Sequence, residues 1–159
     1  MILKHKFGKL KPRYLTTFEP LLKKYAQFGG GSAEDKFYKA KAFSNVYEFY
    51  LYCFFLGLNR NKKLEITDTD EAKGFWEIEN WKPVDLVEQL FVCAIAESDF
   101  NMTEVEQMEE PEIKSEVSKV LRFIESFANG GLLTIQQELD EDEESAMDDL
   151  FFVRLLAEE

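Results

Sequence analysis

The fold class of this chain is decided by the segment Val46-Tyr47-Glu48-Phe49-Tyr50-Leu51-Tyr52-Cys53-Phe54-Phe55-Leu56-Gly57-Leu58. Apolar side chains fill every position from Phe49 to Leu56, so all faces of a helix built from them would be apolar. In a soluble protein such a helix has to be packed on several sides. Asn45 and Glu48 have the spacing of a capping box, which marks a helix start. The sequence therefore predicts a central apolar helix that begins near Asn45.

Five further segments carry apolar residues at helical spacing. We expect them near residues 18–28, 84–95, 113–127, 132–139 and 145–156, and the clearest stripe is that of 113–127. Asn129, Gly130 and Gly131 follow this stripe, and we interpret them as a structural turn that ends the helix, because glycine favours the left-handed C-terminal cap. Trp76 and Trp81 are expected to attach the intervening loop to the core.

The predicted fold is all-α, a compact single-domain bundle of about six helices. A length of 159 residues suits one domain. The first 14 residues are basic and lack apolar periodicity, so we expect a basic flexible arm at 1–14 and a single helical domain at 15–159.

Charge is distributed unevenly along the chain, whose net charge is −12. Residues 1–63 hold 13 Lys and Arg against 4 Asp and Glu, whereas residues 64–159 hold 6 against 27, so the two parts carry net charges of +9 and −21. This asymmetry indicates either a basic region for an anionic partner or two halves that attract each other. The sequence leaves both interpretations open.

A nucleic-acid-binding surface is one hypothesis for the basic half. If its two basic segments adjoin, lysine and arginine could neutralise phosphates while neighbouring aromatic rings stack on bases. Against it stands the acidic remainder of the chain, which would repel nucleic acid. The candidate residues are Lys36, Lys39, Lys41, Arg60, Lys62 and Lys63.

The sequence offers little for catalysis or metal binding. His5 is the one histidine, and Cys53 and Cys93 lie inside apolar helical segments, where we expect buried free thiols. His5, Cys53 and Cys93 do not have the spacing of zinc ligands. The acidic run at 138–144 is interpreted as a solvated loop, and the alternative is docking to a basic surface, for which this chain's own arm is one candidate. We therefore expect no catalytic residue, no metal site and no cofactor.

We also expect a cytoplasmic protein without a membrane segment. The longest apolar run, from Phe49 to Leu58, has ten residues, whereas a membrane-spanning helix needs about 20. The N-terminal residues lack the apolar core of a signal peptide.

Two stretches together resemble a known protein family. They are the segment from Val46 to Leu58 with the basic residues that follow it, and Phe127-Ala128-Asn129-Gly130-Gly131-Leu132 about 70 residues later. In this order the chain resembles the small accessory proteins encoded beside DNA phosphorothioation (Dnd) modification and restriction genes. It departs from their pattern in its long basic N-terminus and at Leu58, where the family has an aromatic residue.

The resemblance implies an accessory or adaptor protein in bacterial defence against foreign DNA, with other proteins of that system as partners. It brings no catalytic residues to this chain. The first hypothesis is thus a non-catalytic protein that acts through protein–protein contacts, by its basic segment or its acidic C-terminal half. The second is a nucleic-acid-binding module, and the third is an enzyme with an unrecognised carboxylate site.

Overall fold

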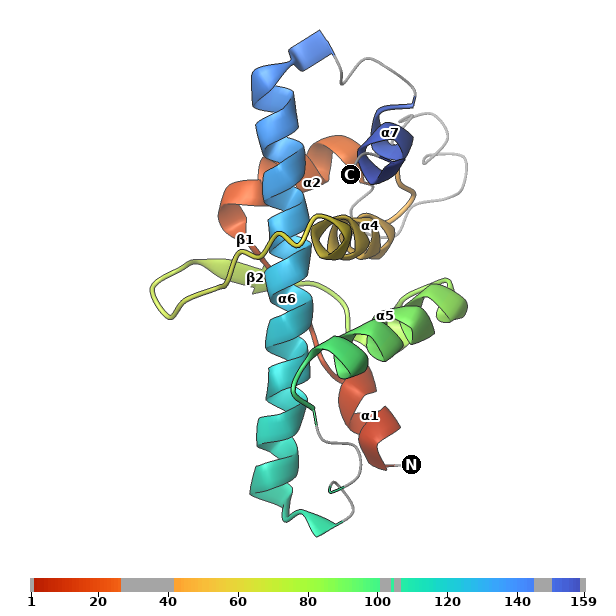
Figure 1. The fold of residues 1–159 in the computed structure, drawn as a ribbon, viewed down its shortest axis with the longest axis vertical. Coiled ribbons are helices and arrows are strands. Elements are labelled where there is room, and N and C mark those ends of the chain that lie inside the picture. The colour runs from red at the N-terminus through yellow and green to blue at the C-terminus, as the bar shows by residue number, and fades with distance from the viewer. Residues whose placement is uncertain (1, 27–41, 101–103, 105–106, 145–149, 158–159) are drawn as a thin grey trace.

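The computed structural model describes residues 2–26, 42–100, 104, 107–144 and 150–157. Most of these residues are helical, and six α-helices occur among them (Figure 1). In chain order the elements are α1 (Ile2–Gly8), β1 (Arg13–Leu15), a 3-10 turn (Thr16–Phe18), α2 (Glu19–Tyr25), α4 (Val46–Asn59), β2 (Ala72–Gly74), a second 3-10 turn (Ile78–Asn80), α5 (Val84–Glu97), α6 (Glu110–Glu141) and α7 (Phe151–Ala157).

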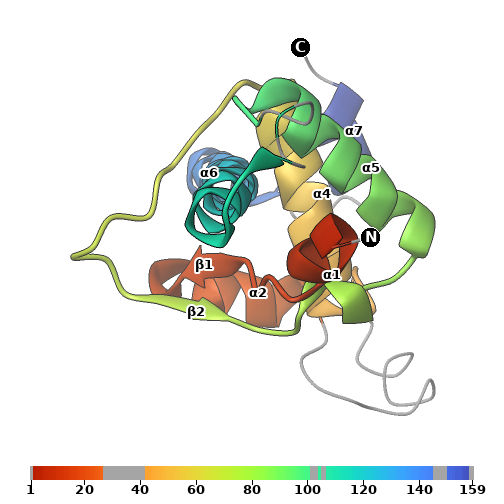
Figure 2. The same cartoon turned by 90° about the horizontal axis from the view of Figure 1, so that it is seen from below.

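The fold is mostly helical, as the sequence predicts, but it is not purely all-α. β1 and β2 pair in an antiparallel sheet with Arg13 opposite Gly74 and Leu15 opposite Ala72. Viewed from below, the two strands lie on one side of α6, and the chain from α4 to β2 passes around α6 to reach them (Figure 2). Short strands of this kind carry no period in the sequence, because three residues are too few to show alternation.

Helix α6 is the longest element, with 32 residues, and α4 crosses it near its middle (Figure 1). The prediction of a turn at Asn129, Gly130 and Gly131 is wrong, because α6 continues through all three residues. Two helical segments expected at 113–127 and 132–139 are therefore one helix. Each interior glycine costs about 1 kcal/mol of helix propensity relative to alanine, so tertiary packing has to offset that cost.

The packing that offsets it is a close crossing of two backbones. A Cβ atom on Gly131 would lie 1.9 Å from the carbonyl oxygen of Cys53, and one on Gly57 would lie 2.0 Å from that of Phe127. A Cβ atom on Gly130 would lie 1.9 Å from the carbonyl oxygen of Lys62. These glycines permit an approach that no other residue allows, so they serve the helix crossing instead of a helix end.

The stretch that is enclosed on all sides lies in α6, whereas the sequence favours the apolar segment of α4. All nine residues from Ile124 to Leu132 are buried. Helix α4 buries nine of its 14 residues and leaves Tyr52, Phe55 and Leu58 partly exposed. It begins at Val46 with Asn45 as its N-cap residue, as expected, although Glu48 accepts the backbone N–H of Ser44 at 3.1 Å.

The prediction of a flexible arm at residues 1–14 is wrong. This segment forms α1 and the start of β1, and the side chains of Phe7 and Tyr14 are only 5% and 3% exposed. The Phe7 ring packs 5.3 Å from that of Phe91 in α5 and 5.7 Å from that of Phe100. The residues that hold this segment lie far from it in the sequence and leave no local periodicity in it. The sequence alone therefore predicts a flexible arm.

Candidate interaction surfaces

Half of the predicted basic site lies outside the described residues, namely Lys36, Lys39 and Lys41. Arg60 is described, and its guanidinium donates to the carbonyl oxygen of Leu155 at 2.9 Å. Asn59 donates to the carbonyl oxygen of Leu156 at 3.3 Å. These are carbonyls of the last turn of α7, where a cation is favourable and where helical partners are missing. Arg60 is therefore used to hold α7 on α4.

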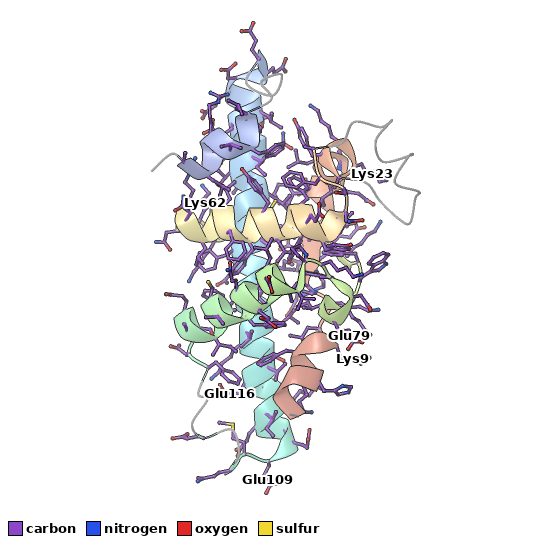
Figure 3. All side chains as sticks on the ribbon, turned by 90° about the vertical axis from the view of Figure 1, so that its right-hand side faces the viewer. Lys9, Lys23, Lys62, Glu79, Glu109 and Glu116 are labelled. Atoms are coloured by element: carbon purple, nitrogen blue, oxygen red, sulfur yellow. The ribbon has the colours of Figure 1, made fainter. Side chains whose placement is uncertain are left out.

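Lys62 and Lys63 follow the end of α4. The Lys62 backbone N–H donates to the carbonyl oxygen of Gly57 at 2.8 Å, and Lys63 places its Nζ 5.2 Å from the centre of the Phe127 ring. Lys62 lies at the opposite end of α4 from Lys23 (Figure 3). The described basic side chains of the N-terminal half are thus spread over the molecule and do not gather in one patch.

Several of these basic side chains are paired with acids of the C-terminal half. Lys9 pairs with Glu79 at 2.7 Å (Figure 3) and with Glu77 at 3.4 Å, and Lys6 pairs with Glu110 at 2.9 Å. The hydrogen bond to Glu79 raises the pKa of Lys9 and lowers that of Glu79. The charge asymmetry of the sequence is thus partly neutralised within one chain, as the second interpretation proposes. Exposed pairs of this kind contribute little to stability.

A buried polar network lies where β1 meets α6. The Glu125 carboxylate, whose side chain is 3% exposed, accepts the backbone N–H and Nε–H of Arg13, both at 2.9 Å. Asn129 accepts the Leu15 N–H at 2.9 Å and donates to the carbonyl oxygens of Arg13 and Glu125 at 3.1 and 2.8 Å. The Tyr50 hydroxyl donates to the carbonyl oxygen of Arg13 at 2.8 Å.

These contacts give the network a structural role. The hydrogen bond to Glu125 raises the pKa of Arg13, and burial raises the pKa of Tyr50 well above its ordinary value. Asn129, predicted as part of a turn, instead holds β1 against α6. The network satisfies the backbone of a strand that would otherwise present unpaired groups to a helix.

A groove of about 410 Å³ lies beside Lys63, between α6 and the end of α5. Lys119 and Arg122 of α6 line it together with Lys63, and neither residue belongs to the basic site predicted from the sequence. Their spacing of three residues places them on one helical face. The same groove is lined by the acids Glu65, Glu97, Asp99 and Glu125. This mixed charge does not favour a polyanion.

A second hollow, of about 530 Å³, is lined by Tyr47, Trp76, Trp81 and Val84, which we name the aromatic shelf, and by the polar residues Glu79, Asn80 and Lys82. Trp81 is 2% exposed, and its indole N–H donates to the carbonyl oxygen of Trp76 at 2.9 Å. Trp76 itself is 49% exposed, with its ring 5.8 Å from that of Tyr47. The prediction that both tryptophans attach the loop to the core therefore holds for Trp81, whereas Trp76 offers half of its surface to solvent.

Helix α7 has apolar residues on two faces. Phe151 and Leu155 are buried at 3% and 2% exposure. Val153 and Leu156 of α7 are 64% and 41% exposed, and their spacing of three places them along one side, while Leu150, which is 58% exposed, precedes the helix. The end of α6, where residues 140–144 are all acidic and exposed, lies at the same end of the molecule (Figures 1 and 3).

Cys53 and Cys93 are free thiols, and the prediction that both are buried holds for Cys53 alone. Burial raises the pKa of Cys53 well above its ordinary value, whereas Cys93 is only partly buried. Within the described ranges, no three histidine, cysteine or acidic side chains are grouped so that they could hold a metal ion. In the same part of the chain, no helix combines the length and the apolar character that crossing a membrane requires.

Comparisons with protein-family models, with curated proteins and with solved structures gave no match.

Proposed function

We propose that this protein is a non-catalytic accessory or adaptor protein of the cytoplasm that acts by binding another protein. The partner belongs to a bacterial DNA-modification or phage-defence system of the Dnd type, on the strength of the resemblance carried by residues 46–58 and 127–132. The observation that carries the binding role is the half-exposed Trp76 on the aromatic shelf.

The chemistry of the aromatic shelf is that of a protein interface. Tryptophan and tyrosine are enriched among the residues that dominate binding energies, especially beside a hollow that a partner side chain fills. Burying the exposed half of the Trp76 side chain would stabilise a complex by about 2–3 kcal/mol. Val84, which is 60% exposed at the edge of the same hollow, would add to the apolar contact.

The aromatic shelf is also held in place before any partner binds. The carbonyl oxygen of Trp76 is fixed by the indole N–H of the buried Trp81, and the ring of Trp76 rests near that of Tyr47. A side chain that is already ordered loses little conformational entropy on binding. Trp76 is therefore suited to a role as an anchor residue.

The test compares tagged wild-type protein with Trp76→Ala after expression in the native host. We expect wild-type protein to recover, in stoichiometric amount, a protein encoded beside the DNA-modification genes, and Trp76→Ala to lose it by about tenfold or more. Val92→Ala is the matched control, because Val92 is 67% exposed on α5 and does not line the hollow. Recovery of the wild-type protein alone would contradict the proposal.

The alternative is a nucleic-acid-binding module. It is favoured by one observation, namely that Lys63, Lys119 and Arg122 line one groove together with the partly exposed Phe123. It is weakened by the acids of that groove and by the pairing of Lys6 and Lys9 with acids elsewhere. A mobility-shift titration decides between the two. Retardation at low salt that falls steeply with added salt, and that Arg122→Glu abolishes, would favour nucleic acid.

A further inference from the structure

We propose that the outer face of α7 and the acidic end of α6 form a second docking surface, which takes an amphipathic helix of a partner protein whose lysine or arginine residues flank an apolar stripe. This goes beyond the proposed function, because it rests on different residues from those of the aromatic shelf. The surface comprises Val153 and Leu156 together with the exposed acidic residues 140–144.

Helix α7 is fixed to the protein without using its outer face. Phe151 and Leu155 are buried, and the rings of Tyr25 and Phe43 each pack 5.0 Å from that of Phe152. The Tyr52 hydroxyl donates to the carbonyl oxygen of Phe152 at 2.6 Å. The side chains of Val153 and Leu156, which are 64% and 41% exposed, take no part in these contacts.

Polar contacts also hold the end of α7. Arg60 and Asn59 bind the carbonyl oxygens of Leu155 and Leu156, as described above. A helix of seven residues would not be stable alone in water. Its attachment to α4 presents Val153 and Leu156 as an ordered surface, which reduces the entropy that binding has to overcome.

The charge of this surface favours one class of partner. Between Glu138 and Glu159 the sequence holds ten acidic residues and a single basic one, Arg154. A polyanion or an anionic membrane would be repelled by this end of the molecule. A second copy of the chain would bring like charges together. A basic protein segment is the class of partner that complements both the acids and the apolar stripe.

The chain's own basic segment does not take this role in the described structure. Lys6 and Lys9 pair with Glu110, Glu77 and Glu79, and Arg13 pairs with Glu125. None of these acids belongs to the run at 140–144. The sequence hypothesis that the acidic run docks to this protein's own arm is therefore not realised by these three residues.

The second docking surface and the aromatic shelf lie in different parts of the molecule, which suits an adaptor protein. Helices α7 and α5 lie on opposite sides of α4 (Figures 1 and 3), and the aromatic shelf includes Val84 at the start of α5. A partner on α7 would thus leave the aromatic shelf open for another. One chain could then hold two proteins of the same system at once.

The test measures fluorescence anisotropy of a synthetic helical peptide in which leucine forms one stripe and lysine fills the other positions. The matched peptide carries glutamate in place of lysine. We expect the full chain to bind the lysine peptide and not the glutamate peptide. We expect Val153→Ser with Leu156→Ser to weaken binding by about tenfold, and Val92→Ser, another exposed valine, to leave it unchanged.

A second variant keeps the proposal testable if the first disturbs α7. Asp140→Asn with Glu143→Gln leaves α7 untouched and is expected to weaken binding by about threefold, with a further loss between about 0.05 M and about 0.3 M salt. Circular dichroism checks that each variant is folded.

Three results would overturn the proposal. Unchanged affinity of the folded serine variant would mean that charge attraction alone binds the peptide. Equal binding of the glutamate peptide would remove the basic partner. A wild-type dimer that the serine variant dissolves, seen by light scattering, would assign the surface to a second copy. Trp76→Ala should leave peptide binding intact, so failure here and failure of the proposed function are separate results.

Discussion

Helix α4 and the middle of α6 reverse the usual relation between hydrophobicity and burial. Helix α4 is almost entirely apolar in sequence, yet it leaves several aromatic and aliphatic side chains partly exposed. The stretch of α6 from Ile124 to Leu132 includes Glu125, Asn129 and two glycines, yet every residue in it is buried. The apolar content of a helix indicates how much surface it can bury, whereas its small and hydrogen-bonding residues indicate how closely other backbones can approach it.

The difference has a physical cause in each region. Large side chains generally keep packed helices about 8–10 Å apart, and α4 departs from this at Gly57, whose added Cβ would lie 2.0 Å from the carbonyl oxygen of Phe127. The glycines of α6 remove that spacing, so the backbones of α4 and of the segment at Lys62 come into contact with the helix. On another side of α6, the polar network around Asn129 replaces side-chain packing with hydrogen bonds to β1.

The largest expected effect is that of Gly131→Ala. Its Cβ would lie 1.9 Å from the carbonyl oxygen of Cys53, so the two helices must move apart. We expect a loss of about 3 kcal/mol or more in the free energy of unfolding, measured by urea denaturation. Alanine favours an isolated helix by about 1 kcal/mol, so stabilisation would show that the crossing does not depend on this glycine. Gly74→Ala is the control, since its Cβ would lie at an ordinary 3.4 Å from Lys11.

Asn129→Ala tests the polar side of α6. It leaves the buried N–H of Leu15 without its acceptor and removes the bond to the carbonyl oxygen of Arg13. We expect the protein to lose about 2 kcal/mol of stability. Gln136→Ala, which removes only an exposed side-chain bond to Asp140, should change stability by less than about 0.5 kcal/mol. Equal effects of the two variants would mean that the network does not hold β1.

Tyr52→Phe tests the partly exposed side of α4. It removes the hydroxyl that donates to the carbonyl oxygen of Phe152 while the ring remains. We expect the free energy of unfolding to fall by about 1 kcal/mol. The amide hydrogens of α7 should exchange faster than in the wild-type protein, whereas those of α6 should change less. Uniform acceleration across both helices would show that α7 is not attached through this contact.

The smallest effect concerns alkaline pH. Burial raises the pKa of Tyr50 and of Tyr52 above the ordinary value of tyrosine. The unfolded chain therefore releases these protons first, at about pH 10, and the stability they contribute is complete below that pH and falls as the pH rises from there. Urea titrations at increasing pH should show this decline, and Tyr52→Phe should make it shallower. An unchanged slope in that variant would assign the decline to other groups.

Part of the fold follows directly from local sequence. Val84–Glu97 and the first half of α6 form helices where the apolar periodicity predicts them, and α4 begins after Asn45. Pro20 occupies the first turn of α2, which its fixed φ angle and missing N–H favour. These features depend on residues within one or two helical turns, so the sequence contains all the information that they require.

The candidate site was less accessible to sequence reasoning. The sequence makes Arg60 a candidate for binding an anionic ligand, but in the structure its guanidinium donates to a carbonyl oxygen in the last turn of α7. Trp76 and Trp81 look equivalent in the sequence, and only the fold buries one and exposes the other. The outer stripe of α7 is visible as spacing, but its exposure depends on which face α4 covers.

The sequence by itself determined a mostly helical chain, the positions of its strongest amphipathic segments and the division of charge between its halves, because these properties are local or additive. The tertiary structure decided whether Gly130 and Gly131 end a helix or lie inside one, and whether residues 1–14 are free or anchored. Those outcomes depend on backbones and side chains far apart in the chain, such as Cys53 against Gly131 and Phe7 against Phe91. Local pattern cannot encode them, because the energy that decides them arises only when the distant partner is in place.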